Sequence, residues 1–363
     1  MTDSYTLAVL PGDGIGPEVI AASLTVLDAV AVAFGLAIER TEYEAGAAYF
    51  ERTGQSIAPE DMEALGEADA ILLGAMGLPH VRQPDGTEIN PQIEMREHYG
   101  LFASLRPARL YPGVPTNVRS SEIDMLVIRE TTEGLFAGRR DPVTTSDTES
   151  SDRLTITRAT SEKLFELAFA QATARRTTHG TPGKVTLFDK ANVLRSNTFL
   201  RRIFDEVAAR YPGITSERLY IDAGCMMLVT QPQRFDVIVT ENVFGDIASE
   251  IAAGVIGGLG VAPSADVSLE HGVFQPCHGT APDIAGKGRA NPVATVLSVA
   301  MMLEWLADRH DDDRLRQAAV AIQDATARVL ERGDSTPDIG GGLTTTQVAE
   351  AIANAIRHPS LAL

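Results

Sequence analysis

The sequence predicts an α/β fold, because short apolar runs alternate with longer segments of helical periodicity along the 363 residues. The first apolar run, residues 7–10, ends in the turn Pro11-Gly12-Asp13-Gly14, and a helical pattern follows from Pro17 to about Phe34. Hydrophobic residues make up 44% of the chain, which is ample for a sizeable core. The length suits two domains or one large α/β unit.

The same alternation continues along the chain. Further strands are predicted at residues 70–73, 125–128, 185–188, 219–221 and 237–239, and they run into charged or Gly-containing turns. In α/β sheets, ligands gather just beyond the carboxyl ends of strands, so we expect a site among these turns. We find no internal repeat and no low-complexity linker, so domains would be divided where the chain crosses between them.

Residues 140–157 interrupt the alternation, because they are rich in Ser, Thr and Asp and show no helical period. They could form a solvated loop or a β-arm. We favour an arm that pairs with a second subunit, since Leu154, Ile156 and the Thr residues suit strands.

The charge of the chain limits its partners. A formal net charge of −18 disfavours nucleic acid and anionic membrane surfaces, although a small anion could bind where basic residues gather. Cys225 and Cys277 are the two cysteines, and their surroundings predict neither a disulfide framework nor a zinc site. The first residues do not resemble a signal peptide, and we expect no membrane-spanning run of about 18 apolar residues. We therefore expect a cytoplasmic protein.

Two glycine-rich segments could approach a ligand. Residues 274–292 form a long run too rich in Gly and Pro for a helix, and a nucleotide would supply partners for its backbone groups. A polar surface connection is the alternative. Gly12, Gly14 and Gly16 suggest a dinucleotide fingerprint, but Pro17 occupies its last glycine position and Asp28 lies within the predicted helix. We therefore reject a Rossmann site.

Charged residues suggest a site for a carboxylate substrate and a metal. Arginines bind carboxylates bidentately, and they occur in the acidic chain at Arg96, Arg106, Arg109 and, after a predicted strand, Arg129. Ordinary surface arginines are the alternative.

Three carboxylates are candidate metal ligands. Asp246 and Glu250 share one face of a predicted helix, and Asp222 lies at a strand terminus. Oxygen ligands suit Mg²⁺ or Mn²⁺, although acidic pairs are also common on solvated faces. Lys190 directly follows a strand and is either a base or a surface lysine.

Several of these segments together resemble the β-decarboxylating dehydrogenases, the family of isopropylmalate, isocitrate, homoisocitrate, tartrate and D-malate dehydrogenases. The similarity extends nearly end to end through motifs in the family's order: LPGDGIGPEV, LFASLRP, RETTEG, DKANVLR, FDVIVTENVFGDIASE and HGTAPDIAGKGRANP. It implies an isocitrate/isopropylmalate dehydrogenase-like fold with two α/β domains and a site in the cleft between them. Residues 1–106 and 260–363 would form the cofactor-side domain. Residues 107–259, including the arm 140–157, would form the second domain.

The resemblance also implies roles for individual residues. Arg96, Arg106 and Arg129 match the arginines that hold the malate carboxylates, and Lys190 relays a proton. Asp246 and Glu250 would bind the metal together with Asp222, and in the family's obligate dimers the residues matching Lys190 and Asp222 reach into the partner's site. Cofactor contacts would come from the adenosine loop and one further turn: His278, Gly279, Thr280, Ala281, Asp283, Ile284, Asn291 and Asn192. A carboxylate at Asp283 would repel a 2′-phosphate, so NAD is expected.

The sequence departs from the family at the reacting end of the site. Phe136 stands where a tyrosine usually protonates the enol, and Glu250 replaces an aspartate. Asn90 and Gln92 stand where isopropylmalate enzymes carry leucines, which favours a smaller or more polar substrate group unless these amides face solvent.

Two functions are compatible with this pattern. We predict an NAD- and metal-dependent oxidative decarboxylation of a malate-type 2-hydroxy acid, similar to 3-isopropylmalate dehydrogenase, with isocitrate, tartrate, D-malate and other 3-substituted malates as further candidates. The alternative, suggested by Phe136 and Glu250, is a non-catalytic binding or regulatory subunit.

Overall fold

The computed structural model describes residues 4–120, 122–138 and 144–358, and it divides into two compact units. Unit 1 comprises the chain up to Tyr99, residues Tyr111–Pro115 and the chain from Ile256. Unit 2 comprises Gly100–Leu110 and Thr116–Val255. The sequence placed the divisions at residues 106/107 and 259/260. The structure places them several residues earlier, so Arg106 belongs to unit 2.

Unit 1 contains five strands in the order β2 (Ala37–Glu42), β1 (Ser4–Leu10), β3 (Ala70–Leu73), β12 (Gly272–Pro276) and β11 (Pro263–Val267). All neighbouring pairs are parallel except β11 and β12, which are antiparallel. Its helices are α1 (Gly16–Phe34), α2 (Ala47–Thr53), α3 (Pro59–Leu65), α4 (Pro91–His98), α10 (Val293–His310), α11 (Asp313–Glu331) and α12 (Thr345–Arg357).

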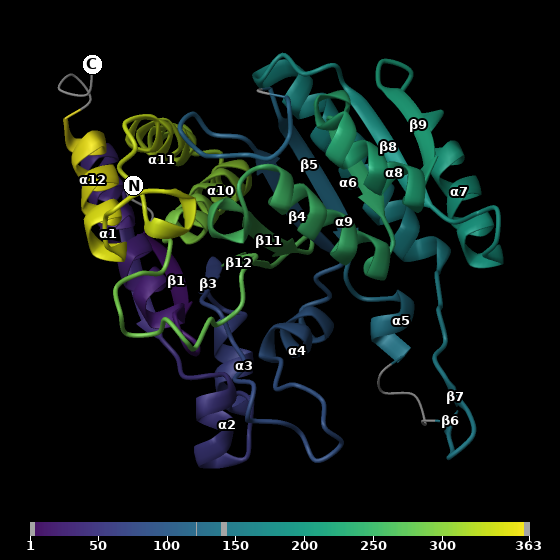
Figure 1. The fold of residues 1–363 in the computed structure, drawn as a ribbon, viewed down its shortest axis with the longest axis horizontal. Coiled ribbons are helices and arrows are strands. Elements are labelled where there is room, and N and C mark those ends of the chain that lie inside the picture. The colour runs from purple at the N-terminus through teal and green to yellow at the C-terminus, as the bar shows by residue number, and fades with distance from the viewer. Residues whose placement is uncertain (1–3, 121, 139–143, 359–363) are drawn as a thin grey trace. The chain divides into compact units, whose positions relative to one another are not determined.

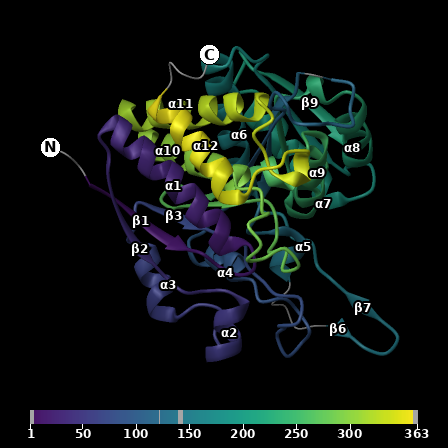
Figure 2. The same ribbon diagram turned by 60° about the vertical axis from the view of Figure 1, so that its left-hand side comes forward.

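Helix α1 is the one helix in the described residues that is long and apolar enough to cross a membrane by length and composition alone. No membrane-spanning run was expected from the sequence, and α1 meets only the length and composition test. In the structure α1 packs against α10, α11 and α12, and Figures 1 and 2 show α1 beside α12. Val19, Val26, Leu27 and Val30 are fully buried, so α1 is a core helix of unit 1.

Unit 2 contains the strand order β4 (Ala103–Arg109), β5 (Asp124–Glu130), β10 (Val237–Thr240), β8 (Lys184–Asp189) and β9 (Thr215–Tyr220). Strands β4 and β5 are antiparallel, and the remaining pairs are parallel. All four residues of β10 are buried, as is usual for a central parallel strand. The helices are α5 (Gly134–Ala137), α6 (Arg158–Thr178), α7 (Arg195–Ala208), α8 (Ile221–Thr230) and α9 (Asn242–Val255).

The expected arm is partly described. Strands β6 (Thr144–Thr145) and β7 (Ser150–Ser151) form an antiparallel hairpin that projects from the rest of unit 2 (Figure 1). Residues 140–143 of the expected arm lie outside the described residues. Pairing of this hairpin with a second subunit stays a prediction.

Asp236, the residue just before β10, is hydrogen-bonded to α6, to the start of β8 and to β5. Its carboxylate is 1% exposed and accepts hydrogen bonds from Arg175 Nε at 2.8 Å and from the backbone N–H groups of Gly183 and Lys184 at 3.0 and 3.1 Å. The Asp236 carbonyl also accepts from Leu126 at 2.8 Å. A buried carboxylate without these donors would be strongly unfavourable, so this network orders the amino ends of β5, β8 and β10.

We expect Asp236→Asn to lower the free energy of unfolding by about 3–5 kcal/mol, because it leaves the Arg175 guanidinium without its buried counter-ion. Urea unfolding followed by circular dichroism measures the change. The control is Asp205→Asn, which breaks a half-exposed pair with Arg218 and should cost less than about 1 kcal/mol. Equal losses in both variants would contradict a special role of Asp236.

Candidate active site

The guanidinium of Arg129, near the end of β5, contacts three other side chains. Its side chain is almost fully buried, and Nε and Nη2 donate to Asn242 Oδ1 at 3.0 and 2.8 Å. Nη1 pairs with Asp246, and the guanidinium lies 5.2 Å from the centre of the Phe136 ring. These contacts fix the plane of the guanidinium, which is what a carboxylate-binding arginine requires.

Arg106 on the neighbouring strand β4 has a second carboxylate of α9 nearby. Its Nε donates to Ser104 Oγ at 3.2 Å, and Nη1 lies 3.8 Å from Glu250 Oε1. Partial burial raises the pKa of Glu250, Arg106 opposes this shift, and the charge of Asp246 adds to it. The two arginines expected to bind substrate are therefore balanced by the two acidic residues expected to bind metal.

The donor set fits a hard divalent cation only in part. Asp246 and Glu250 lie on one face of α9 with side chains 40% and 45% exposed, so their oxygens are accessible. The described residues of the single chain bring together no group of three or more His, Cys, Asp or Glu side chains suited to a metal. Mg²⁺ often binds through one or two carboxylates and keeps several waters, so Asp246 and Glu250 could hold it with oxygens from elsewhere.

Lys190 and Asp222 form a separate pair in unit 2. Lys190 Nζ lies 2.8 Å from Asp222 Oδ1, and the hydrogen bond from Lys190 lowers the pKa of Asp222. Asp222 lies in the first turn of α8, just after the end of β9, whereas the sequence placed it at the strand terminus. The backbone N–H of Lys190 donates to the buried Asn197 side chain at 2.8 Å, which fixes the turn after β8.

In unit 1, Arg96 and Gln92 share one face of α4. Arg96 is buried, and its Nε donates to Asp266 Oδ2 at 2.8 Å. Gln92 lies one turn earlier, and its buried Oε1 has no hydrogen-bond partner among the residues that the structure describes. Asn90 precedes the helix, is half-buried and makes no side-chain capping bond. An unpartnered amide oxygen beside an arginine is a candidate acceptor for a substrate donor.

The irregular segment 277–292 is built against the opening turn of the chain. The Ile15 N–H donates to the Thr280 carbonyl at 2.8 Å, and a Cβ on Gly14 would lie 2.2 Å from that oxygen. Ile284 packs against Ile15 and Val19. These contacts explain why glycine is required at residue 14, whose φ is +58°.

The loop offers groups that fit a nucleotide. His278 Nε2 is buried and has no partner within the described part of the chain, and burial lowers the pKa of this imidazole, so the ring is neutral at pH 7. Ala281 adopts a left-handed backbone with φ of 37°, while Gly279 and Asp283 are exposed. The orphaned ring nitrogen and the exposed carboxylate suit the base and hydroxyl groups of an adenosine.

Asn291 and Asn192, which the sequence also predicted to contact the cofactor, do not belong to the exposed part of the loop. Asn291 is buried, its Oδ1 accepts from the Val293 N–H in the first turn of α10, and its Nδ2 donates to Asp338. Both polar atoms of this side chain are therefore already hydrogen-bonded within the protein. Asn192 is exposed in the turn after Lys190, in unit 2. A cofactor contact from either residue stays a prediction.

Sequence reasoning missed the residues that hold the charged groups. Asn242, Ser104 and Asp266 contact the three expected clamp arginines. Ser104 and Arg106 share a strand face by their spacing of two, which was a usable signal. Asp266 is 170 residues from Arg96, and no local pattern indicates that pairing.

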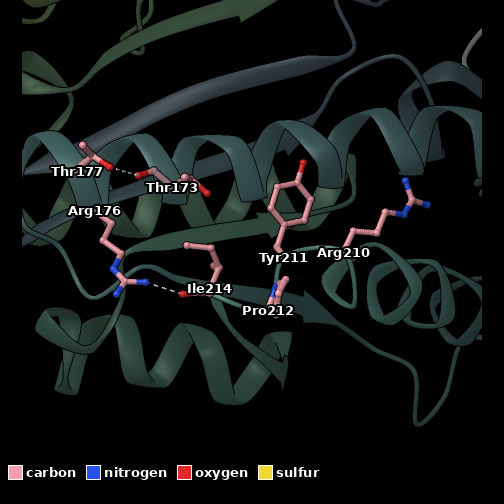
Figure 3. Close-up of a pocket in the computed structure, with 8 residues that line it drawn as sticks. Thr173, Arg176, Thr177, Arg210, Tyr211, Pro212 and Ile214 are labelled. Carbon is pink, nitrogen blue, oxygen red and sulfur yellow. Dashed lines mark hydrogen bonds between the residues drawn. The ribbon is translucent and has the colours of Figure 1, made fainter.

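A pocket of about 510 Å³ lies elsewhere in unit 2, between α6 and the segment after α7 (Figure 3). Its arginines are already engaged, because Arg176 donates to the Gly213 carbonyl and Arg210 pairs with Glu166. The pocket contains none of the expected site residues.

These groups define the class. Buried arginines beside paired carboxylates, a lysine next to an aspartate and an irregular loop with exposed polar groups, on an α/β fold, are the parts expected of a β-decarboxylating dehydrogenase. Residues 6–352 match the family model described as isocitrate/isopropylmalate dehydrogenase. The chain belongs to this family.

Individual relatives agree. A 3-isopropylmalate dehydrogenase of Thermobifida fusca is 43% identical, covering 96% of this chain and 97% of the relative. A 3-isopropylmalate/3-methylmalate dehydrogenase of Methanocaldococcus jannaschii is 40% identical over 98% of this chain and 99% of the relative. An isocitrate dehydrogenase structure from Methylococcus capsulatus is 34% identical with a TM-score of 0.85, covering 97% and 99% of the two chains.

The expected isocitrate/isopropylmalate dehydrogenase-like fold is confirmed by these similarities. The protein is an oxidoreductase of the NAD-dependent β-decarboxylating class, whose members use a nicotinamide cofactor and a divalent metal for oxidative decarboxylation. The alternative of a non-catalytic subunit is therefore not supported.

Proposed function

We propose that the protein oxidatively decarboxylates a 3-substituted malate with NAD and Mg²⁺ or Mn²⁺, and that the substituent is as small as, or more polar than, isopropyl. The observation that supports this most is the arginine cluster, in which Arg129 lies beside the accessible carboxylate of Asp246 and the neighbouring Arg106 beside that of Glu250. Relatives named 3-isopropylmalate dehydrogenase make 3-isopropylmalate the first candidate substrate. Against isopropyl, which carries no donor, the Gln92 Oε1 that has no partner among the described residues would favour a more polar substituent able to donate a hydrogen bond.

In this proposal the arginines bind and orient the substrate. Arg106 and Arg129 each exchange an acidic partner on α9 for a substrate carboxylate, and Arg96 contributes a further donor. Asp246 and Glu250 would then hold the metal, which when bound polarises the substrate hydroxyl and stabilises the charge that develops on decarboxylation. Asp283 accepts from the ribose 2′-hydroxyl and disfavours a 2′-phosphate.

Lys190 holds the mobile proton. Its Nζ lies 2.8 Å from Asp222 Oδ1, so the carboxylate orients the amino group. We propose that Lys190, as the neutral amine, accepts the substrate hydroxyl proton; NAD, when bound, would accept the hydride from the carbon that carries this hydroxyl.

We expect NADH formation with Mn²⁺ from at least one member of a panel comprising 3-isopropylmalate, 3-methylmalate, isocitrate, homoisocitrate, D-malate and tartrate. Absorbance at the NADH wavelength measures the rate, and NADP should support a rate at least about 10-fold lower because Asp283 repels its extra charge. Lys190→Met should lower kcat by about 100-fold or more, since one positioned acid–base group contributes about that much. Failure of every substrate with folded protein would refute the proposal.

Phe136 determines how the enol is protonated. Its ring covers the Arg129 guanidinium and is 37% exposed, and a phenyl group carries no transferable proton. We propose that water donates this proton in the native protein.

Phe136→Tyr would place a hydroxyl at the same ring position, and we expect faster release of the decarboxylated product, by about 10-fold if protonation limits turnover. Product formation followed by NMR in D₂O measures both rate and proton uptake. Phe136→Leu is the control and should give no increase. An unchanged rate in Phe136→Tyr would show that another step limits turnover or that the ring is remote from the enol.

We propose that the protein acts as a homodimer through α8 and α9. Met226, Val229 and Ile247 on these helices are 55%, 51% and 50% exposed, which is unusual for neighbouring apolar side chains. Asp222, Met226 and Val229 share one face of α8 by their spacing, so an interface there would carry Asp222 to the partner.

Met226→Asp combined with Val229→Asp should convert the dimer to monomer and abolish turnover, because charges cannot be buried in the interface. Sedimentation velocity measures the mass. Val32→Asp on α1, where the side chain is 85% exposed, is the control and should leave the dimer intact. A wild-type monomer with full activity would exclude shared sites.

A further inference from the structure

We propose that Asp266 and Gln275 are positioning residues that fix the Arg96 guanidinium, so that substrate affinity depends on a carboxylate at residue 266. This inference rests on the proposed function, in which Arg96 binds a substrate carboxylate. It concerns three buried side chains of unit 1 that come from α4, β11 and β12.

Two donors converge on one oxygen. Asp266 Oδ2 accepts from Arg96 Nε at 2.8 Å and from Gln275 Nε2 at 2.9 Å. The antiparallel register pairs Ser264 with Gln275 and Asp266 with Val273, so Asp266 and Gln275 are diagonal neighbours on one face of the hairpin. Gln275 therefore restrains the carboxylate, and the carboxylate in turn restrains the arginine.

The bond to Nε has a specific consequence for binding. A guanidinium that is held at Nε cannot rotate about its long side chain, so the directions of its terminal N–H groups are set before substrate arrives. Asp266 is 1% exposed and Arg96 is 6% exposed, so water screens this pair little. Because Asp266 already balances the arginine's charge, Arg96 contributes oriented donors more than net attraction.

We expect Asp266→Asn to raise the KM for the panel substrate with the fastest turnover by about 10-fold to 100-fold, because the amide oxygen that remains holds Arg96 without the charge-assisted strength of the carboxylate. The kcat at saturation and the KM for NAD should change by less than about 3-fold, because the side chain acts on substrate orientation alone. Steady-state kinetics are measured at a temperature where melting curves show both proteins folded.

An exchange variant separates positioning from general stability. Asp266→Asn combined with Gln275→Glu retains one carboxylate and one amide in the diagonal pair, and it should recover part of the lost affinity. Gln275→Glu alone places two buried carboxylates within hydrogen-bond distance and should lower the melting temperature. A lower melting temperature in Asp266→Asn with an unchanged KM would overturn the positioning role.

Arg96→Gln distinguishes failure of this inference from failure of the function on which it rests. A raised KM in Arg96→Gln, with no further rise when Asp266→Asn is added, supports Asp266 acting through Arg96. A raised KM in Arg96→Gln but not in Asp266→Asn overturns the positioning role and leaves the arginine clamp intact. An unchanged KM in Arg96→Gln overturns both.

Discussion

The burial of the Arg129 guanidinium is the constraint on which the organisation of unit 2 depends. A permanently charged group at this depth must be neutralised and hydrogen-bonded, and both requirements are met from the first two turns of α9. The helix approaches so closely that a Cβ on Gly245 would lie 2.6 Å from Arg129 Cβ and Cγ. Glycine at this position therefore sets the distance at which Asp246 meets the strand end.

The close contact between α9 and β5 also places the second arginine and the second carboxylate, Arg106 and Glu250. Strands β4 and β5 are antiparallel neighbours in which Ser104 lies opposite Arg129, so Arg106 follows two residues beyond on the same face of β4. One helical turn separates Asp246 from Glu250, which brings the second carboxylate to the second arginine. Charges that are balanced within the protein can be exchanged for substrate and metal at lower electrostatic cost than charges buried alone.

The carboxylates that pair with the arginines of unit 2 are more exposed than the one that pairs with Arg96 in unit 1. Asp246 and Glu250 are 40% and 45% exposed, so in the proposed function they would be free to turn towards a cation when Arg129 and Arg106 bind substrate. Asp266 is 1% exposed and is held by Gln275, so it stays with Arg96 throughout. Exposed carboxylates thus suit ligands that are exchanged, and the enclosed carboxylate suits a fixed support.

Local patterns in the sequence predicted the elements whose structure depends on local forces. The strand expected at residues 70–73 matches β3, and the shared face of Asp246 and Glu250 follows from the periodicity of α9. The antiparallel pairs β4/β5 and β11/β12 were not predicted, because strand neighbours are chosen by long-range packing. Asp266 and Asn242 were missed as arginine partners for the same reason, since they are 170 and 113 residues from the arginines they hold.

The irregular segment 277–292, proposed to bind the cofactor, is anchored at both ends before any ligand is present. The Thr280 carbonyl accepts from Ile15, and Ile284 packs against the start of α1, so part of the backbone and one apolar side chain are already satisfied. Asn291 fixes the far end by starting α10 and by bonding to Asp338. With both ends anchored, the proposed nucleotide would have little order left to impose on this segment, and its binding energy would be available for discrimination at Asp283.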